Sequence, residues 1–574
     1  MISLGLNFGS HDSAAALTID GKIIAAAEEE RFTREKHTKK IPLNSITYCL
    51  NKGRVNLKDV DNIALFINPE LQPLILPYTM FSDFPSSLNY LNYGLNLIRK
   101  RNKIVDVLKF NLQNKELQNK IQFVNHHYAH AASAYYCSPF DDAAILTIDG
   151  RGEYESIALF IGEGNTIKKI SSTKYPHSIG YLYSAITKYL GFKTQSDEYK
   201  VMGLSAYGDE KLNNFFNDLG KINNKGKFIL NLDYFDHHIK GNDRQLFSSK
   251  LVQTFGAPRQ SDEPLTQKHA DISKGLQFLT ENLILDLAEY AKYRTGKKNL
   301  CLAGGVALNC LANQKLAESN LFDKIFVQPA ANDSGTSIGA ALYTTFKNSK
   351  SIQRNPFNSV YLGPSFSNIE IESTLLKYSD ELTHTFISFP SKTAAELIAN
   401  NKIIGWFQGE MEFGPRALGN RSILASASDA KMKDLVNNKI KFREPFRPFA
   451  PAVLDEDVNK YFNTEHSAEY MYPFMVCTAK VKDEAVNIIP AVTHKDQTGR
   501  LQIVEKTNNK LFWELISEYK KITNVGVILN TSFNINGEAI VCTPEDAIYN
   551  FMESGLDNII IGNYLVNKKQ NNKL

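Results

Sequence analysis

The chain has 574 residues, of which 43% are hydrophobic and 22% charged, the composition of a globular protein too long for one ordinary core. Its 65 basic and 61 acidic residues give a net charge of +4, which excludes a general affinity for nucleic acid or membrane surfaces. No apolar run approaches the ~18 residues of a membrane helix, and no basic segment of a signal peptide opens the chain. We therefore expect a cytoplasmic protein whose six cysteines are reduced.

The chain opens with a predicted β-hairpin. The apolar runs "ISLGLNF" and "AAALTID" are joined by the turn "GSHDS", and Asp20-Gly21 then leads into "KIIAAAEEE". An Asp-Gly pair between apolar runs is a strong hairpin signal. His11 lies in the first turn beside Asp12 and is a candidate to take a proton from a hydroxyl group, because imidazole titrates near neutral pH. A polar pair that only stabilises the turn is the alternative.

The next segment, "ERFTREKHTKK" (30–40), carries six basic side chains when His37 is counted. Such a run is predicted to be a solvated face. Lys36 and His37 are also candidates for the rim of an acceptor pocket.

The hairpin pattern recurs near residue 143. There "AAILTID" is followed by the loop "GRGEYE" and by "SIALFIGEG". Two hairpins that each carry a glycine-and-acid loop predict the duplicated lobes of an actin-like, sugar-kinase-like ATPase. In that arrangement the backbone N–H groups of the paired loops bind nucleotide phosphates.

Histidines crowd into "NHHYAHAASAYYCSPF". His126 and His130 are spaced i, i+4, so on a helix they share one face and can bind one metal ion, while His127 points away. Asp149 and Asp333 each follow a buried strand and can complete the site. Two histidines with two carboxylates suit Fe(II), Zn or Mn, and the alternative is four unrelated core or surface residues.

Glycines predict two turns from strand to helix. "KNLCLAGGVALNCLANQKLA" (298–317) contains Gly304-Gly305, and "DKIFVQPAANDSGTSIGAALYTTF" (323–346) contains the loop around Asp333. Glycines at a helix start allow a close approach by an anionic ligand. Between the hairpins and these turns, residues 270–296 have helical periodicity and a Gly296 stop.

The sequence "SDEYKVMGLSAYG" (196–208) predicts a loop that holds Glu198 and Lys200. Lys200 is a candidate to reach nucleotide phosphates as a point charge. An exposed pair of charges is the alternative.

Composition divides the chain into a first domain over 1–350, a linker over 351–368 and a second domain over 369–574. The linker is polar and has no clear period. Beyond it, "NKIIGWFQ", "YPFMVCTAKV", "LQIVEK", "VGVILNTSF" and "EAIVCTP" are predicted strands of a second α/β domain.

The second domain carries a compact group of cations in "FGPRALGNRS" and "KFREPFRPFAP". Arg416, Arg421, Arg443 and Arg447 lie on backbone stiffened by prolines and anchored by phenylalanines. Guanidinium groups stay charged and match phosphate oxygens, so the group predicts a site for a small phosphate-bearing anion. Nucleic acid fits less well, because the overall charge is nearly balanced.

The sequence resembles the NodU/CmcH-type O-carbamoyltransferases, which include the tobramycin carbamoyltransferase. The resemblance spans residues 4 to 547 in family order and rests on "GLNFGSHDSAAAL", "AEEERFTREKH", "HHYAHAASAY", "DGRGE", "EYKVMGLSAYG", "GGVALN", "GPRALGNRSILA", "KFREPFRPFAP", "IPAVTHKDQTGRLQ" and "NTSFNINGEAIVCTPEDA". Jointly these motifs are specific, although no single one is.

The resemblance implies an N-terminal actin-like (ASKHA) duplicated ATPase fold and a C-terminal YrdC-like α/β domain. It also implies the reaction: the second domain joins ATP and carbamoyl phosphate into carbamoyl-adenylate, and the first transfers the carbamoyl group to a hydroxyl of a secondary metabolite or glycan-like acceptor. Fe(II) is the implied cofactor and Mg-ATP the co-substrate.

The resemblance also assigns residues. It implies His11 and Lys36 as catalytic groups on the acceptor side and His126, His130, Asp149 and Asp333 as iron ligands. The motifs place the nucleotide in the first domain at Gly150, Arg151, Gly152, Lys200, Gly304, Gly305 and Asn309. For ATP and carbamoyl phosphate in the second domain they indicate Arg416, Arg421, Lys441, Arg443, Arg447, Arg500, Asn530 and Ser532, with Asp12 and Asp236 near the acceptor.

Two other functions fit parts of the sequence. A sugar-kinase-like phosphotransferase explains the paired hairpins and predicts ADP as product, but it leaves the arginine-rich domain without a task. A nucleotide sensor would bind ATP without turnover. The expected partners are carbamoyl phosphate, ATP and a small acceptor, with no nucleic acid and no membrane, and a homodimer is the default assembly.

Overall fold

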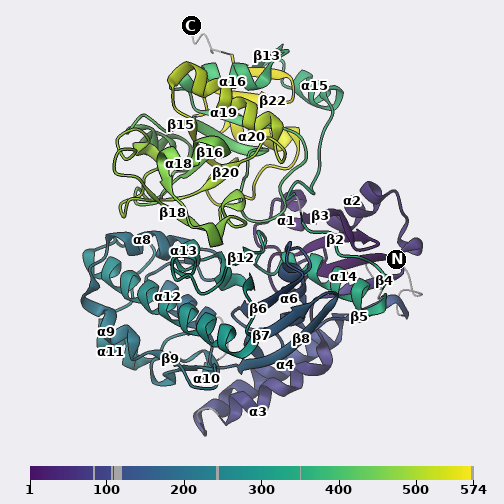
Figure 1. Cartoon of the computed structure of the whole chain (residues 1–574), viewed down its shortest axis with the longest axis vertical. Coiled ribbons are helices and arrows are strands. Elements are labelled where there is room, and N and C mark those ends of the chain that lie inside the picture. The colour runs from purple at the N-terminus through teal and green to yellow at the C-terminus, as the bar shows by residue number, and fades with distance from the viewer. Residues whose placement is uncertain are drawn as a thin grey trace. The chain divides into compact units, whose positions relative to one another are not determined.

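The chain folds into two compact units in the computed structural model (Figure 1). The first contains Met1–Ala25 and Lys39–Phe357, and the second contains Ala26–Thr38 and Asn358–Leu574. The change of unit after residue 357 falls within the stretch predicted as a linker. The structure describes all residues except 82, 83, 105, 107, 109–118, 241–244, 350, 358 and 570–574.

The first sheet of the first unit has the order β3-β2-β1-β4-β5. Its strands are β1 (Ile2–Asn7), β2 (Ala14–Ile19), β3 (Lys22–Glu28), β4 (Asn62–Leu65) and β5 (Ile121–Phe123). Asp20 and Gly21 turn β2 into β3 with φ of 47° and 76°. Positive φ at both turn positions is the geometry that Asp-Gly favours, so the predicted hairpin is confirmed.

A second sheet repeats this order as β8-β7-β6-β11-β12. Its strands are β6 (Asp142–Ile148), β7 (Glu155–Glu163), β8 (Thr166–Lys174), β11 (Asn299–Ala303) and β12 (Lys324–Val327). In the first sheet β1 pairs antiparallel with β2 and parallel with β4. In the second sheet β6 likewise pairs antiparallel with β7 and parallel with β11. The repeated topology is the duplication that the actin-like prediction requires.

Two helices pack closely in the first unit, α6 (His126–Tyr135) and α14 (Gly335–Asn348). A Cβ atom added to Gly339 would lie 1.8 Å from the carbonyl oxygen of Ala129, and one added to Gly5 would lie 1.8 Å from that of Ser337. Only glycine permits such an approach of backbones. The helix that carries His126 and His130 is thereby held against the helix that follows Asp333.

Of two further predictions in the first unit, the long helix is confirmed and the loop around Lys200 is wrong. The predicted long helix is confirmed as α12 (Gln267–Thr295), and Gly296 caps it with φ of 64°. The predicted loop at Glu198 and Lys200 is wrong, because both residues begin helix α8 (Glu198–Leu204). Glu198 accepts from the backbone N–H of Gln195 at 2.8 Å, which helps to start the helix.

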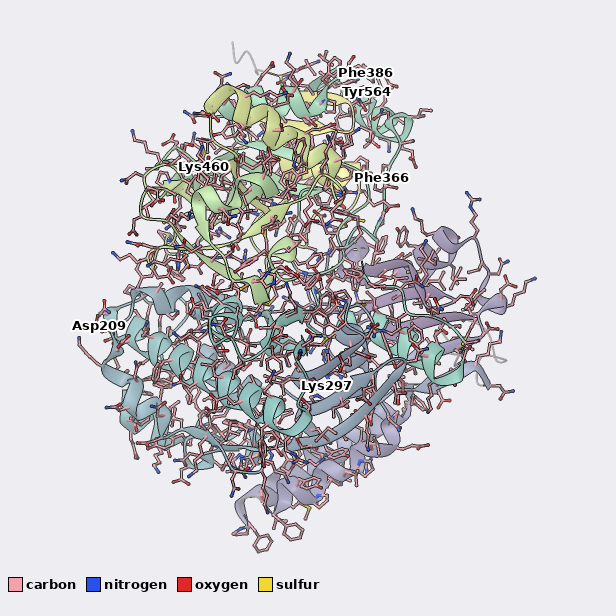
Figure 2. The ribbon with its side chains drawn as sticks, viewed as in Figure 1. Asp209, Lys297, Phe366, Phe386, Lys460 and Tyr564 are labelled. Carbon is pink, nitrogen blue, oxygen red and sulfur yellow. The ribbon has the colours of Figure 1, made fainter. Side chains whose placement is uncertain are left out.

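The second unit is built on an eight-stranded sheet of order β13-β23-β22-β14-β15-β21-β16-β20. The strands are β13 (Leu382–Phe386), β14 (Ile404–Phe407), β15 (Arg421–Ser426), β16 (Ala450–Leu454), β20 (Gln502–Val504), β21 (Val527–Ser532), β22 (Asn558–Ile561) and β23 (Tyr564–Lys568). Phe386 and Tyr564 are cross-strand partners at its edge, with ring centroids 5.6 Å apart (Figure 2). The prediction of a mixed α/β second domain is confirmed.

Helices α16 (Pro390–Ala399) and α19 (Lys510–Thr523) pack together on this sheet, around a core that contains the fully buried Trp406. A small sheet of order β17-β18-β19 holds β17 (Phe462–Asn463), β18 (Thr478–Val481) and β19 (Thr498–Arg500).

The predicted strand "EAIVCTP" is wrong. The carbonyl groups of Ala539 and Ile540 accept from the side chain of Arg34 instead of from a strand.

The segment Ala26–Thr38 belongs to the second unit, although it comes from the start of the chain. Its helix α1 (Glu29–Thr33) places Arg31 between Glu28 and Glu30, and Arg31 also donates to the carbonyl of Gly414 at 2.9 Å. Phe32 packs against an apolar cluster that includes Met411. The predicted solvated face is therefore wrong at Arg31, which is 4% exposed.

Candidate functional site

Four predicted metal ligands meet in the first unit. His126 and His130 lie on one face of α6, Asp149 follows β6, and Asp333 precedes α14. One ligand atom from each residue lies within 4.8 Å of the others. His127 bonds Thr147 and the carbonyl of Glu155, so it takes no part in the cluster, as the spacing predicted.

The distances within this cluster leave room for an ion. Nε2 of His130 lies 3.5 Å from Oδ1 of Asp333 and 4.0 Å from Oδ2 of Asp149. Nε2 of His130 and Oδ1 of Asp333 are buried and have no hydrogen-bond partner among the described residues. Ligands about 2.1 Å from a shared ion lie ~3.4 Å apart, so the set fits a divalent metal.

Glu153, which the sequence reasoning did not select, positions the helix of the cluster. Its fully buried carboxylate accepts from the backbone N–H groups of His126 and Asn68, at 3.1 and 2.7 Å, and from the side chain of Asn125 at 2.9 Å. A carboxylate at a helix start satisfies amides that have no partner within the helix. Glu153 is the final residue of the motif "DGRGE", so this motif is the sequence feature that could have identified it.

Neighbouring glycines fix Asp149. The backbone N–H of Gly305 donates to Oδ1 of Asp149 at 3.0 Å, and a Cβ atom added to Gly152 would lie 2.9 Å from Cβ of His126. Burial would raise the pKa of Asp149, but the hydrogen bond and charge of His126 and the Gly305 amide hold that pKa well below its ordinary value. Asp149 therefore presents a charged carboxylate.

The predicted acceptor-side residues of the first turn lie at the edge of this cluster. Nδ1 of His11 is 3.0 Å from Oδ2 of Asp12, and its Nε2 is 3.7 Å from Oδ2 of Asp333. Burial would lower the pKa of His11, but the carboxylates of Asp333 and Asp12 raise it to about 10. Ser10 donates to Oδ2 of Asp333 at 2.9 Å, which sequence reasoning missed.

The predicted nucleotide residues of the first unit fall into two groups. Gly150, Gly152, Gly304 and Gly305 surround Asp149, and a Cβ atom added to Gly150 would meet nothing within 4 Å. Asn309 caps helix α13 (Cys310–Glu318), and Lys200 pairs with Asp197 at 3.3 Å. Arg151 donates to the hydroxyl of Tyr90 at 2.7 Å. Asp236, which was predicted near the acceptor, pairs with Lys240 at 3.0 Å.

Lys441 is the central cation of the second unit. It is 3% exposed, and its Nζ donates to the carbonyl oxygens of Ser532 and Asn534 at 2.5 and 2.9 Å and to Oδ1 of Asn534 at 2.9 Å. Burial, followed by the charges of Arg443, Arg447 and Lys36, holds the pKa of Lys441 well below its ordinary value. A buried cation beside other cations favours an anionic ligand.

The neighbours of Lys441 are held by their own contacts. Nε of Arg443 donates to Oδ1 of Asn437 at 2.7 Å, and its guanidinium lies 4.3 Å from the ring centroid of Phe449. Arg447 approaches Glu444 at 3.6 Å. Asn530 donates to the side chain of Gln502 at 2.8 Å. Arg500 ends the small sheet as part of β19.

The loop that carries Arg416 is folded around a buried acid, Glu412. Oε1 of Glu412 accepts from the backbone N–H groups of Leu418 and Asn420, both at 2.7 Å, and Asn530 donates to the carbonyl of Ala417 at 3.3 Å. Asn530 and Ser532 lie two positions apart on β21, and the latter binds Lys441. One strand therefore holds both the Arg416 loop and Lys441.

Arg421 makes structural contacts. It is fully buried, and its guanidinium donates to the carbonyl oxygens of Gln408 and Pro364 at 2.5 and 2.9 Å and stacks over Phe407. These bonds join β14 to the chain that enters the second unit. Its predicted ligand contact stays a prediction.

Lys36 also lies in the second unit, within the segment Ala26–Thr38, and its charge reaches Lys441.

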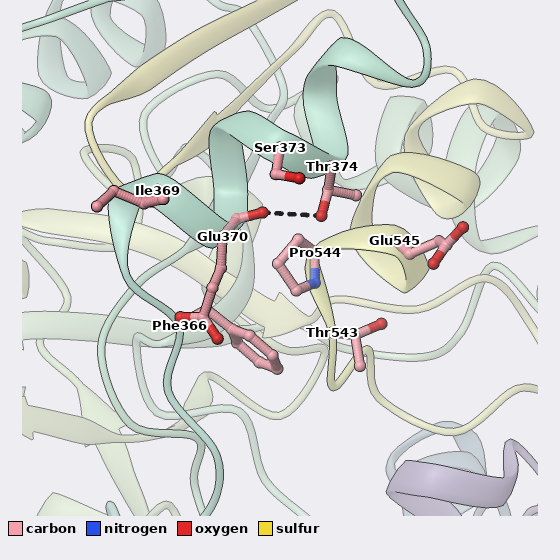
Figure 3. Close-up of a pocket in the computed structure, with 8 residues that line it drawn as sticks. All are labelled: Phe366, Ile369, Glu370, Ser373, Thr374, Thr543, Pro544 and Glu545. Carbon is pink, nitrogen blue, oxygen red and sulfur yellow. Dashed lines mark hydrogen bonds between the residues drawn. The ribbon is translucent and has the colours of Figure 1, made fainter.

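A separate hollow of about 470 Å³ in the second unit contains none of the predicted site residues (Figure 3). Its lining comes from α15 (Asn368–Leu376), the start of α20 (Pro544–Met552) and the residues just before them. Across the described part of the chain, no helix is long and apolar enough to span a bilayer.

Comparison with known proteins adds the following. Residues 3–342 match a family model described as Carbamoyltransferase N-terminus, and residues 395–568 match Carbamoyltransferase C-terminus. The chain is 39% identical to an uncharacterised protein of Synechocystis sp., over 98% of this chain and 96% of the relative. It is 39% identical to Nodulation protein NolNO of Sinorhizobium fredii, over 97% and 79% of the two chains, and 30% identical to Nodulation protein U of that species, over 92% and 93%.

Proposed function

We propose, since the chain belongs to the carbamoyltransferase family, that it is an ATP-dependent O-carbamoyltransferase that works in two steps. The observation that carries this proposal is a pair of complementary sites, one in each unit. The first unit holds a buried set of two histidines and two carboxylates, and the second holds the buried Lys441 among arginines.

The first step takes place in the second unit. Carbamoyl phosphate, ATP and one water give carbamoyl-adenylate, pyrophosphate and phosphate. Lys441 and Arg443 bind the phosphate groups, because a buried ammonium and a guanidinium gain most from a charged oxygen in a site that excludes water. Glu412 and Asn530 hold the Arg416 loop in place, so this cation is positioned before the ligand arrives.

The second step takes place in the first unit. The oxygen of an acceptor hydroxyl attacks the carbamoyl carbon, the bond to AMP breaks, and the hydroxyl proton leaves. His126, His130, Asp149 and Asp333 would hold a divalent metal, for which Fe(II) is the proposed identity, and this ion would supply positive charge to phosphate oxygens. Glu153 orients His126, and the open backbone at Gly150 admits the phosphate. The assignment of His11 as proton acceptor stays a prediction, and it requires that the positive charge of a bound metal offset the carboxylates that raise the pKa of His11.

The test separates the proposed chemistry from phosphoryl transfer. The full chain is incubated with ATP, carbamoyl phosphate and Fe(II), and the nucleotide products are resolved by chromatography. Pyrophosphate that forms only when carbamoyl phosphate is present supports the proposal. ADP without pyrophosphate indicates a kinase-like reaction and overturns it. Mass spectrometry of a panel of hydroxyl compounds then identifies the carbamoylated acceptor by its mass increase.

A further inference from the structure

Asp333 directs only one of its two carboxylate oxygens at the histidines of the cluster. Its Oδ1 lies 3.5 Å from Nε2 of His130 and 3.7 Å from Nε2 of His126, and it is buried without a hydrogen-bond partner among the described residues. Its Oδ2 instead accepts a hydrogen bond from the hydroxyl of Ser10 at 2.9 Å. The protein therefore holds one oxygen and leaves the other for an ion.

Asp149 is arranged in the same way by a different donor. The backbone N–H of Gly305 donates to its Oδ1 at 3.0 Å, while its Oδ2 lies 3.0 Å from Nε2 of His126 and 4.0 Å from Nε2 of His130. Both carboxylates thus present a single oxygen, and the protein offers two oxygen and two nitrogen atoms to one ion. An ion that prefers octahedral coordination would keep positions for water or phosphate oxygens.

The hydrogen bond from Ser10 is the close contact that fixes Oδ2 of Asp333. Nε2 of His11 is 3.7 Å from this oxygen, which is too far for a hydrogen bond. Among the described residues, only Ser10 donates to Oδ2 of Asp333 at hydrogen-bond distance. A hydroxyl that donates to a charged oxygen makes a strong hydrogen bond, so Ser10 opposes rotation of the carboxylate.

The turn that carries Ser10 is itself held in place. The side chain of Asn7 donates to the carbonyl groups of His11 and Asp12 at 3.1 and 2.8 Å, and the backbone N–H of Gly9 donates to the carbonyl of Lys39 at 3.0 Å. These bonds lie on both sides of Ser10 along the chain. The position of its hydroxyl is therefore set by the fold and does not depend on a ligand.

We propose that Ser10 is a positioning residue of the metal site, because its hydroxyl holds Asp333 as a ligand through Oδ1 alone. Without this bond the carboxylate would be able to turn and offer both oxygens, which would take up a position that the substrate phosphate needs. This inference rests on the metal ion of the proposed function. It gives a task to the serine of "GSHDS", in which only His11 and Asp12 were predicted to act.

Binding of Co(II) alone to the full, metal-free chain tests the role of Ser10 without turnover. Equilibrium dialysis gives the Kd, and the visible absorption of the bound Co(II) reports its coordination. We expect Ser10→Ala to raise the Kd about tenfold or more, the usual effect of removing a group that orients a metal ligand. The absorption spectrum should change as well, because Asp333 is then free to bind differently.

Ser13→Ala is the matched control. Ser13 belongs to the same turn, but its buried hydroxyl has no hydrogen-bond partner among the described residues, so its loss should leave the Kd and the spectrum unchanged. Ser10→Thr keeps a hydroxyl and should recover most of the affinity. Circular dichroism and Tm of the metal-free proteins report on folding. If Ser10→Ala does not fold, Ser10→Gly provides the same comparison.

Three outcomes overturn the role of Ser10: Co(II) affinity and spectrum that are equal in wild type and Ser10→Ala, an equal loss in Ser13→Ala, or a loss of turnover in Ser10→Ala with unchanged metal binding. The last outcome would make Ser10 a substrate contact. Wild type that binds no Co(II) overturns the metal assignment together with this inference. Failure of the proposed reaction is detected separately, because wild type would then bind Co(II) but release no pyrophosphate from ATP and carbamoyl phosphate.

Discussion

Nε2 of His126 lies 3.0 Å from Oδ2 of Asp149, although the two residues come from a helix and from the end of a strand. Gly305 fixes the other carboxylate oxygen of Asp149, and Glu153 fixes the backbone of His126 at the start of its helix. A pair whose members are held by such contacts keeps its geometry when charge is added between them. This preorganisation is what a metal site requires.

Asp333→Asn should abolish tight metal binding. The change keeps the size of the side chain but removes one of two negative charges and a ligand oxygen, so we expect retention of Fe(II) or Zn to fall by at least tenfold. Metal content after dialysis, measured by elemental analysis, gives the result. Asp209→Asn is the control, because this exposed carboxylate belongs to the same unit (Figure 2). Equal metal content in all three proteins would contradict the assignment.

Lys441→Met should lower pyrophosphate release by about a hundredfold or more, the usual effect of losing one charge-stabilising group in a buried site. Lys431→Met is the matched control, since Lys431 is exposed just before α17 (Met432–Val436). The assay is pyrophosphate release from ATP and carbamoyl phosphate. Similar rates in the two variants would exclude Lys441 from the first step.

The same lysine should make stability depend on pH. Its pKa is lowered in the folded chain, so the folded state disfavours the proton that the unfolded state still binds. As pH rises from the lowered pKa towards the ordinary value of 10.5, wild type should therefore gain stability relative to Lys441→Met. Urea unfolding of both proteins across this range measures the difference. A difference that stays constant or falls with pH would show that the ammonium is not destabilised.

Arg416 lies in the loop before β15 and Arg421 is the first residue of that strand, and the two should respond differently to replacement by lysine. Arg421→Lys loses donors to buried carbonyl groups, so we expect the free energy of unfolding to fall by about 3 kcal/mol. Arg416→Lys should leave stability nearly unchanged and lower pyrophosphate release. Denaturant unfolding and the release assay are run on both. The reverse pattern would make Arg421 the ligand residue.

Arg34→Ala should destabilise the second unit. It removes hydrogen bonds of 2.6 Å to the carbonyl groups of Ala539 and Ile540, and we expect a loss of about 1–2 kcal/mol. Lys39→Ala, an exposed neighbour in the first unit, is the control. Hydrogen exchange of the amides near Ile540 locates the effect. Unchanged protection there would mean that the segment 26–38 does not support this part of the fold.

The sequence predicted those features whose cause is local. Asp20-Gly21 fixes a hairpin because few other residues adopt two successive positive φ angles, and the i, i+4 spacing brings His126 and His130 to one face. It also predicted the partnership with Asp149 and Asp333, because each of these acids follows a buried strand.

Features whose cause lies far away in the chain were missed. The basic run 30–40 looks like a surface, but Arg31 is neutralised by Glu28 and Glu30. Arg34 donates to carbonyl groups 505 and 506 positions away and lies 3.8 and 3.5 Å from the carboxylates of Glu538 and Asp546. Likewise Arg421 carries the same charge as Arg443, and only its burial among carbonyl oxygens distinguishes the two. Charge alone does not tell a ligand residue from a structural one.

The early segment 26–38 has a consequence for synthesis on the ribosome. Arg34 emerges 506 residues before Ile540, and translation at 5–20 residues per second makes that interval roughly 25–100 s. During this time Phe32 lacks two of the three buried residues of its final cluster, Ile540 and Cys542, and the second unit is completed only when nearly the whole chain has been made. Any nascent chain that stops early would leave this stretch available to chaperones.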